Sequence, residues 1–143
     1  MIRTRQQLLY SASATRRILN LPPDVPVRVQ EFHRVIWVHI SGQRPTFISK
    51  QVYHQHFVDR RREAARALLT YRTVEGWVVL NPLKNTTYQV KTYKTHLSCT
   101  CEDYRNQVYF LGRACCKHCY AVLAELGFTS LREYLSDQKF QRN

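Results

Sequence analysis

Glycine and proline are scarce in this chain of 143 residues, which contains four of the first and five of the second. Chains rich in these residues form linkers or collagen-like structures, and the composition excludes both because 44% of the residues are hydrophobic. No stretch approaches the roughly 20 consecutive apolar residues of a membrane-spanning helix. We therefore expect a packed globular protein of one domain, or of one domain with an appendage, and no membrane partner.

The usual sequence signatures of an enzyme are also missing. There is no glycine-rich phosphate loop, no cluster of carboxylates and no Ser/His/Asp spacing suited to nucleophilic catalysis. Cys116 and Cys119 have the Cys-x-x-Cys spacing of a redox pair. Redox pairs of this kind occur next to a βαβ unit, which the flanking sequence does not indicate. A redox pair would also leave Cys99 and Cys101 without a role. We expect no enzymatic activity.

Acidic residues are few, since ten Asp and Glu stand against 22 Lys and Arg and the net charge is +12. Residues 1–98 hold sixteen of the basic residues and five of the acidic ones, whereas residues 99–143 are nearly balanced. A basic surface of this kind favours a nucleic-acid partner whose phosphates meet the upstream part of the chain. The simpler alternative is that the charge only aids solubility.

The five cysteines all lie between residues 99 and 119. An odd, clustered set suits a reducing compartment such as the cytoplasm, and it suits a metal better than a disulfide framework. Along an extended chain Cys99 and Cys101 point to the same side, while Cys116 and His118 lie about a turn or less apart at a helix start. Three thiolates and one imidazole predict a closed tetrahedral zinc site, which is structural rather than catalytic.

Other ligand pairs remain open in the second half of this motif. Cys115 with His118, or Cys116 with Cys119, also has a spacing that zinc sites use. We favour Cys116 with His118 and regard Cys119 as the first substitute. Cys119 also falls on an apolar helical stripe, so it is interpreted as a small buried residue.

The ligand spacing Cys-x-Cys-x14-Cys-x-His resembles that of the SWIM zinc finger. The resemblance rests on Cys-Thr-Cys-Glu-Asp-Tyr at residues 99–104 and Cys-Lys-His-Cys-Tyr-Ala-Val-Leu at residues 116–123, and it covers residues 77–126. It implies a β-hairpin that carries the first ligand pair, a helix that carries the second, and binding to nucleic acid or protein without catalytic residues. The implied ligands are Cys99, Cys101, Cys116 and His118.

Upstream of the finger the pattern predicts helices and strands. A short helix over residues 14–20 with Ser13 as its cap would end before Pro22-Pro23. Strands are expected within residues 27–40, where Ile36, Val38 and Ile40 form a buried face. A long helix is expected from a cap at Ser49 to about Leu69.

The strongest charge run of the chain lies in that long helix. Arg61 falls within the apolar face and must pair, extend its charged end to solvent or mark a contact site. The surrounding arginines would form a ridge that contacts phosphates, here called the basic ridge: Arg60, Arg62, Arg66 and Arg72. The alternative is a solvated helix face with the intrahelical pairs Asp59–Arg62 and Glu63–Arg66.

The C-terminal part is expected to begin with a strand over residues 76–80. Residues 88–92 and 93–99 would form a hairpin in which Lys91 and Lys94 alternate with tyrosines. Such a surface can grip a nucleic-acid strand, but any half-exposed β-surface also has this composition. The finger helix is expected to end at Gly127, and a capping box predicts a last helix from Ser130 to about Ser136.

Together these patterns predict an α+β fold in which a small antiparallel sheet packs against helices and zinc staples a β-hairpin to a helix. The expected segments are a basic region over residues 1–75, the zinc finger over 76–128 and a short helix with its tail over 129–143. We expect a zinc-binding, non-enzymatic accessory module that binds nucleic acid, with DNA favoured over RNA. The alternative is an adaptor that binds a protein through the zinc finger.

Overall fold

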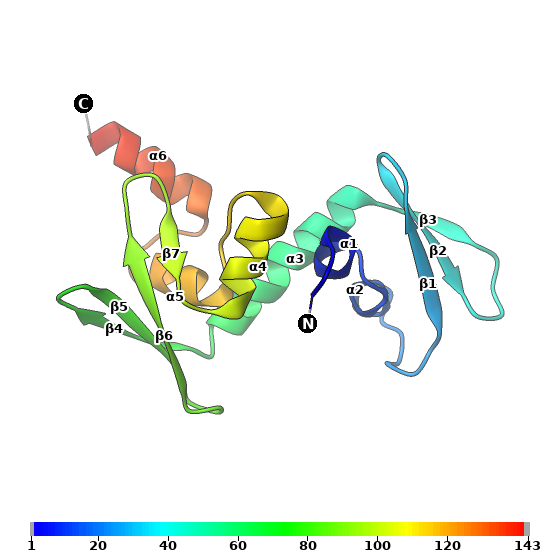
Figure 1. Cartoon of the computed structure of the whole chain (residues 1–143), viewed down its shortest axis with the longest axis horizontal. Helices are drawn as coiled ribbons and strands as arrows, with labels where there is room; N and C mark the ends of the chain where they lie inside the picture. The colour runs from blue at the N-terminus through cyan, green and yellow to red at the C-terminus, as the bar shows by residue number, and fades with distance from the viewer. Residues whose placement is uncertain (1, 142–143) are drawn as a thin grey trace. The chain divides into compact units, whose positions relative to one another are not determined.

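The structure is a computed structural model that describes residues 2–141, and it has the expected α+β fold (Figure 1). The chain forms two small antiparallel sheets where one was expected. It divides into two compact units, one up to Arg60 and one from Arg61 onwards. The segments proposed from sequence, 1–75, 76–128 and 129–143, stay a prediction.

The first unit begins with two short helices, α1 (Arg5–Leu9) and α2 (Ala12–Ile18). The helix expected over residues 14–20 is present as α2, but its bounds and its Ser13 cap are wrong, and α1 was not predicted. Ser11 has extended backbone and its hydroxyl oxygen accepts a hydrogen bond from the Ala14 amide at 3.0 Å, so the helix begins two residues earlier.

A three-stranded sheet follows, in the order β1 (Val27–Glu31), β2 (Val35–Ile40) and β3 (Thr46–Ser49). Ile36, Val38 and Ile40 are buried as predicted, because alternate residues of a strand share one face. In Figure 1 the helices of this unit lie on that side of the sheet. The fully buried Thr15 and Tyr53 hydroxyls meet at 2.7 Å within this core.

Helix α3 (Lys50–Ala65) begins directly after Ser49, whose hydroxyl accepts a hydrogen bond from the Gln51 amide. The expected end at Leu69 is wrong. After Ala65 the amides of residues 66–68 bond to carbonyls three residues back, and Leu69 then pairs with Leu80 as the first residue of a strand. Pairing in the sheet thus overrides the helical propensity of this run.

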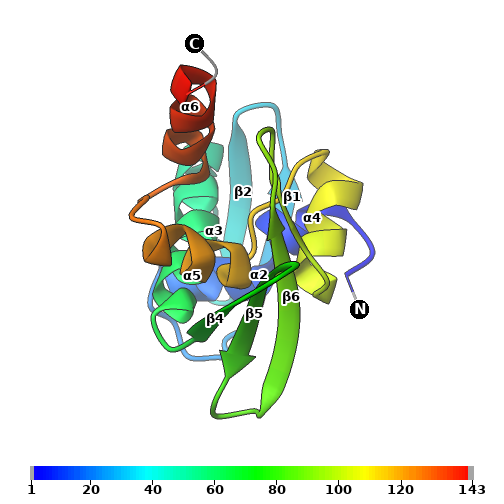
Figure 2. The same cartoon turned by 90° about the vertical axis from the view of Figure 1, so that its left-hand side faces the viewer.

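The second unit contains a four-stranded sheet in the order β4 (Leu69–Thr73), β5 (Gly76–Asn81), β6 (Thr86–Thr92) and β7 (Leu97–Cys99). The hairpin into the first ligand pair is confirmed, but the second strand begins at Leu97 because the segment from Tyr93 to His96 forms its turn. Helix α5 (Lys117–Glu125) lies against this sheet and contacts all four strands (Figure 2).

Two further helices complete the second unit. Helix α4 (Glu102–Leu111) was not predicted, and its N-terminal cap is Cys101, whose sulfur accepts a hydrogen bond from the Tyr104 amide. Helix α6 (Leu131–Gln141) has the expected Ser130 cap but runs five residues beyond the predicted end at Ser136. No helix among the described residues has the length and apolar character needed to cross a membrane.

Candidate metal centre

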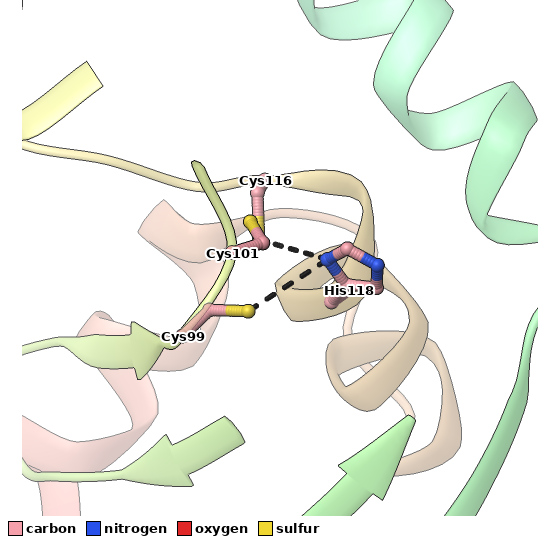
Figure 3. Close-up of side chains that lie close together, drawn as sticks. All are labelled: Cys99, Cys101, Cys116 and His118. Carbon is pink, nitrogen blue, oxygen red and sulfur yellow. Dashed lines mark hydrogen bonds between the residues drawn. The ribbon is translucent and has the colours of Figure 1, made fainter. Parts of the chain in front are cut away.

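Four side chains from three parts of the second unit converge on one point. Cys99 ends β7, Cys101 precedes α4, Cys116 precedes α5, and His118 lies in the first turn of α5 (Figure 3). All four are buried, and their ligand atoms lie within 4.8 Å of one another. We call this set the metal cluster.

The spacing within the metal cluster suits a tetrahedral ion. The Nδ1 atom of His118 lies 3.7 Å from the sulfur of Cys99 and 3.7 Å from the sulfur of Cys116. Zinc–sulfur bonds of about 2.3 Å and zinc–nitrogen bonds of about 2.0–2.1 Å place tetrahedral ligand atoms about 3.5–3.8 Å apart. These two distances match that spacing and the remaining ones are no longer than 4.8 Å, so the four side chains could hold a metal ion.

The local electrostatics favour thiolates over thiols. The hydrogen bond from Cys101 lowers the pKa of Cys116 to about 6, with help from the bond to Cys119. At Cys99 the bond to Cys101 raises the pKa, but the bonds to Cys116 and Cys119 outweigh it and the pKa falls to about 6. Thiolates are the form in which cysteine binds metals.

The imidazole of His118 is the counterion of these sulfurs when no metal is bound. Burial lowers the pKa of His118, but hydrogen bonds to three cysteine sulfurs outweigh burial and raise the pKa to about 11. A metal ion needs the neutral ring, so its binding must displace this proton. The Tyr88 ring, whose centroid lies 4.6 Å from that of His118, covers the imidazole.

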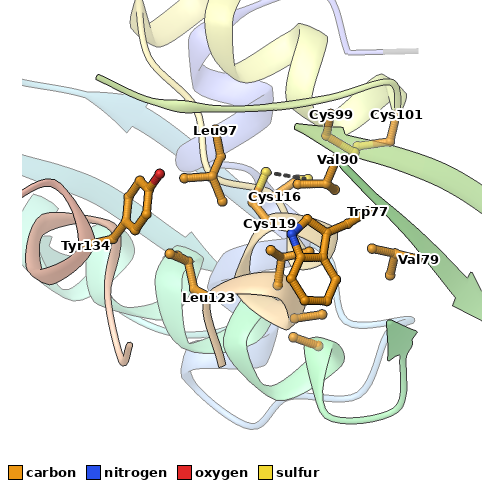
Figure 4. Packing of buried hydrophobic residues seen from close by; sticks show 13 residues of the cluster. Trp77, Val79, Val90, Leu97, Cys99, Cys101, Cys116, Cys119, Leu123 and Tyr134 are labelled. Atoms are coloured by element: carbon orange, nitrogen blue, oxygen red, sulfur yellow. Dashed lines mark hydrogen bonds between the residues drawn. The ribbon is translucent and has the colours of Figure 1, made fainter. Parts of the chain in front are cut away.

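Cys119 and Cys115, the alternative ligands, occupy different positions. Cys119 is fully buried on α5 and lies in the apolar core beside Cys116 (Figure 4). Its sulfur lies 3.6 Å from that of Cys116. Cys115 is partly exposed. Neither belongs to the set of four whose ligand atoms lie within 4.8 Å of one another.

The hydrophobic core of the second unit surrounds the metal cluster. Trp77 and Val90 from the sheet, together with Leu97 and Leu123, pack in the same buried cluster as the three ligand cysteines (Figure 4). The ligands are thus part of the core rather than an attachment to its surface. A bound metal would join the hairpin β6–β7 to helix α5 from within.

A polar network supports the segment before Cys116. Arg61 makes a two-pronged ion pair with Asp103, at 2.8 and 2.9 Å, so pairing is the one of the three expected alternatives that the structure shows. Asp103 accepts a hydrogen bond from Gln107, and Gln107 bonds both the amide and the carbonyl of Cys115. Sequence reasoning missed Gln107, because the helix that carries it was not expected.

The basic residues expected to meet phosphates do not form one continuous face. Arg72 pairs in register with Trp77, whose side chain is buried in the core, and lies over that ring at 5.6 Å. Lys91 follows Val90, the other partner of Trp77, so its side chain lies on the opposite face of the sheet. Lys94 lies in the β6–β7 turn, and Arg60 is the last residue of the first unit.

Arg62 and Arg66, by contrast, line one hollow of about 420 Å³ in the second unit. Its remaining lining comes from the end of α3, the turn after it, β4, α5 and the segment after α5: Ala65, Leu68, Thr70, Tyr120, Ala121, Ala124, Glu125, Phe128 and Thr129. Arg66 also pairs with Glu63 at 3.2 Å, as expected for the solvated helix face, and Asp59 bonds Gln55. The helix that carries His118 thus forms one wall of the hollow that the two arginines line.

Comparisons with models of protein families, with curated protein sequences and with solved structures found no match for this chain. The site is therefore assigned from its own residues. They define a protein with a buried Cys3His cluster that could hold a metal ion, compatible with a zinc finger.

Proposed function

We propose that this chain is a zinc-binding, non-enzymatic accessory module, and that residues 77–126 form a SWIM-type zinc finger. The observation that carries the proposal is the closed, buried set of three cysteines and one histidine. Four protein ligands leave no position for a substrate or an activated water, which is the pattern of a structural zinc site. In this proposal the zinc stabilises the fold of the second unit, and the surface residues around it bind the partner.

The partner of this module is nucleic acid, with DNA favoured over RNA. The net charge of +12 supports this partner, as do the exposed arginines Arg60 and Arg62 on α3 and Arg66 in the turn after it. Phosphate contacts through such residues supply most of the sequence-independent affinity of nucleic-acid-binding proteins. Because Arg62 and Arg66 share a hollow with the zinc-bearing helix α5, the metal supports the surface that they line.

A protein partner is the second candidate. The same hollow has apolar lining from Ala65, Leu68, Ala121 and Phe128, and an apolar contact there would make the chain an adaptor. Salt separates the two functions. Phosphate binding weakens steeply with ionic strength, whereas an apolar contact does not.

The test is a nucleic-acid titration of the zinc-loaded chain at several salt concentrations. In the triple variant Arg60→Ala, Arg62→Ala and Arg66→Ala, we expect weaker binding and a shallower dependence on salt. Each lost phosphate contact removes about 0.9 from the logarithmic slope for B-form DNA. Circular dichroism of the variant should be unchanged because all three side chains lie at least partly in solvent.

A matched control removes three positive charges from the nearly neutral C-terminal part: Arg113→Ala, Arg132→Ala and Lys139→Ala. This control should bind like the unaltered chain. If the two triple variants bind equally well, Arg60, Arg62 and Arg66 are not the contact surface. If the unaltered chain binds no nucleic acid at any salt concentration, the proposal of a nucleic-acid partner is wrong and the adaptor replaces it.

A further inference from the structure

The outward face of the β1–β2–β3 sheet carries aromatic and polar residues, whereas its buried face carries aliphatic ones. Opposite residues in the antiparallel register share a face, so Gln30, Trp37 and Phe47 form one row across the three strands, on the side away from buried Val38. Arg28 lies beside His39 in the next row. Figure 1 shows the helices of this unit on the other side of the sheet.

Aromatic rings gather on this outward face. Trp37 and His39 are nearly parallel, with an interplanar angle of 16° and centroids 5.9 Å apart. Phe47 is 60% exposed, and it meets the 46% exposed Phe32 of the β1–β2 turn edge to face at 6.2 Å. Single exposed apolar residues are ordinary, but four rings on one face of a small sheet mark a contact surface.

The charge of this face is positive. Glu31 is the only acidic residue from Pro26 to Ser49, and it opposes the buried Ile36 and pairs with Lys50 at 2.7 Å, away from the rings. Arg28 lies on the aromatic face, while Arg34 and Arg44 lie in the turns at either end of β2. Within residues 2–141, no side-chain hydrogen bond or ion pair is formed by these three arginines.

We propose that this aromatic face, formed by Phe32, Trp37, His39 and Phe47, binds a single strand of nucleic acid. The rings stack on unpaired bases, and the three arginines hold the phosphates on either side. Paired bases in a duplex keep their faces covered, so they cannot use the rings. The inference rests on the proposed nucleic-acid function and deepens it, because it names the strand state and a second contact surface in the first unit.

A protein partner would also cover exposed rings, but the positive charge of this face favours a polyanionic partner. A face with arginines and no carboxylate complements a polyanion along its whole length, and stacking on rings next to cations is the usual way to hold single strands. The sugar does not enter this contact. DNA and RNA strands therefore share the chemistry that this face recognises.

The experiment uses the full zinc-loaded chain and fluorescence anisotropy with three probes: an oligothymidylate of about 15 nucleotides, the matching oligouridylate and a duplex of the same length. We expect tighter binding of the single strands than of the duplex. Phe47→Leu, which keeps an apolar side chain but removes the ring, should weaken single-strand binding about tenfold, a typical effect of one lost stacking contact. Phe47→Tyr should bind like the unaltered chain.

Two controls separate stacking from general effects. Tyr109→Leu removes an 82% exposed ring from α4 of the second unit and should leave binding unchanged. In the Trp77→Phe variant, Trp37 is the only tryptophan of the chain, so its fluorescence reports directly on this face. A stacked base should quench that fluorescence during titration with the single strand.

Equal affinity for duplex and single strand, with Phe47→Leu as tight as the unaltered chain and no quenching of Trp37, would overturn the inference. The proposed function would stand in that case, since binding would still occur through other basic residues. If none of the three probes binds, both the inference and the nucleic-acid function fail. Similar affinity for the oligothymidylate and the oligouridylate, with both sensitive to Phe47→Leu, would support the inference.

Discussion

Gln107 is the residue that ties the peptide before Cys116 to the rest of the second unit. Its amide nitrogen donates to Asp103 at 2.9 Å and to the Cys115 carbonyl at 3.3 Å, and its oxygen accepts from the Cys115 amide at 2.9 Å. The side chain is only 2% exposed, so water cannot readily replace these bonds. Gln107 therefore fixes the backbone that presents a ligand of the metal cluster.

We predict that Gln107→Leu lowers the free energy of unfolding by about 1–3 kcal/mol, because it leaves the Cys115 amide and carbonyl without partners. Metal affinity should also fall, by about tenfold or more, as it does when residues that orient metal ligands are removed. Urea unfolding and competition with a chromogenic chelator measure the two effects.

The matched control for this residue is Gln141→Leu, which removes an exposed hydrogen bond to Asp137 near the end of α6. Exposed positions of this kind change the free energy of unfolding by no more than about 0.5 kcal/mol. Equal losses in the two variants would show that Gln107 does not support the site.

Strand β5 begins at a residue that has no room for a side chain. Gly76 has φ +150°, and a Cβ atom there would lie 2.7 Å from the carbonyl oxygen of Val90 in the neighbouring strand β6. Gly112, after α4, has φ +78° but no atom within 4 Å of such a Cβ. The two glycines share a backbone that disfavours side chains and differ in the space around them.

We predict that Gly76→Ala destabilises the second unit more than Gly112→Ala does. The alanine at residue 112 should cost about 1–2 kcal/mol for its backbone conformation alone. The alanine at residue 76 has this cost as well, and its Cβ atom also clashes with the Val90 carbonyl oxygen. Relief of that clash requires β5 to move away from β6. Urea unfolding followed by circular dichroism measures the free energy of unfolding of each variant. If Gly76→Ala lowers it no more than Gly112→Ala does, the close approach of residue 76 to the Val90 carbonyl is refuted.

Strands β1 and β2 were predictable because apolar and β-branched residues alternate along them, and the buried set Ile36, Val38 and Ile40 follows directly. Strand β3 was not predicted, because only four residues separate the turn before it from α3. Helix α4 was not predicted. Its first turn adjoins the ligand pair Cys99 and Cys101 and was interpreted only as part of the metal site, and two of its apolar residues, Val108 and Tyr109, are exposed. Without an apolar stripe, periodicity gives no helix signal. Strand β4 was missed because its pairing with β5 depends on side chains that meet only in the folded sheet.

At the scale of the whole molecule, the two units have separate cores. The metal cluster lies within the buried core of the second unit, whereas the core of the first unit contains no cysteine. Structural zinc sites supply about 10–16 kcal/mol of apparent binding energy, which is more than a small domain usually has in reserve. Loss of the metal should therefore affect one unit far more than the other.

We predict that chelation removes hydrogen-exchange protection from residues 97–126 while β1 and β2 keep theirs. Mass spectrometry of deuterated peptides, with and without a strong chelator, follows each segment. Return of protection after zinc is added back is the control for irreversible damage. Uniform loss across both units, or no loss in residues 97–126, would contradict a structural role of the metal in the second unit.

The metal ligands could be predicted from sequence because four soft ligands in two closely spaced pairs are typical of a metal site, and the four favoured residues are those that the structure brings together. The hollow beside α5 and the aromatic face could not be predicted from the sequence. Each depends on strand register or on helix placement, which decide whether Arg62 and Arg66, or Trp37 and Phe47, lie side by side.

The most direct test of the metal centre is the metal content of the purified chain by native mass spectrometry, which weighs the folded protein with its bound ions. We predict one zinc ion per chain, and no zinc in the variant that combines Cys99→Ser with Cys116→Ser. Cys119→Ala should retain the full zinc complement, since that thiol lies outside the metal cluster. A chain that carries no zinc after purification with zinc present would contradict the account.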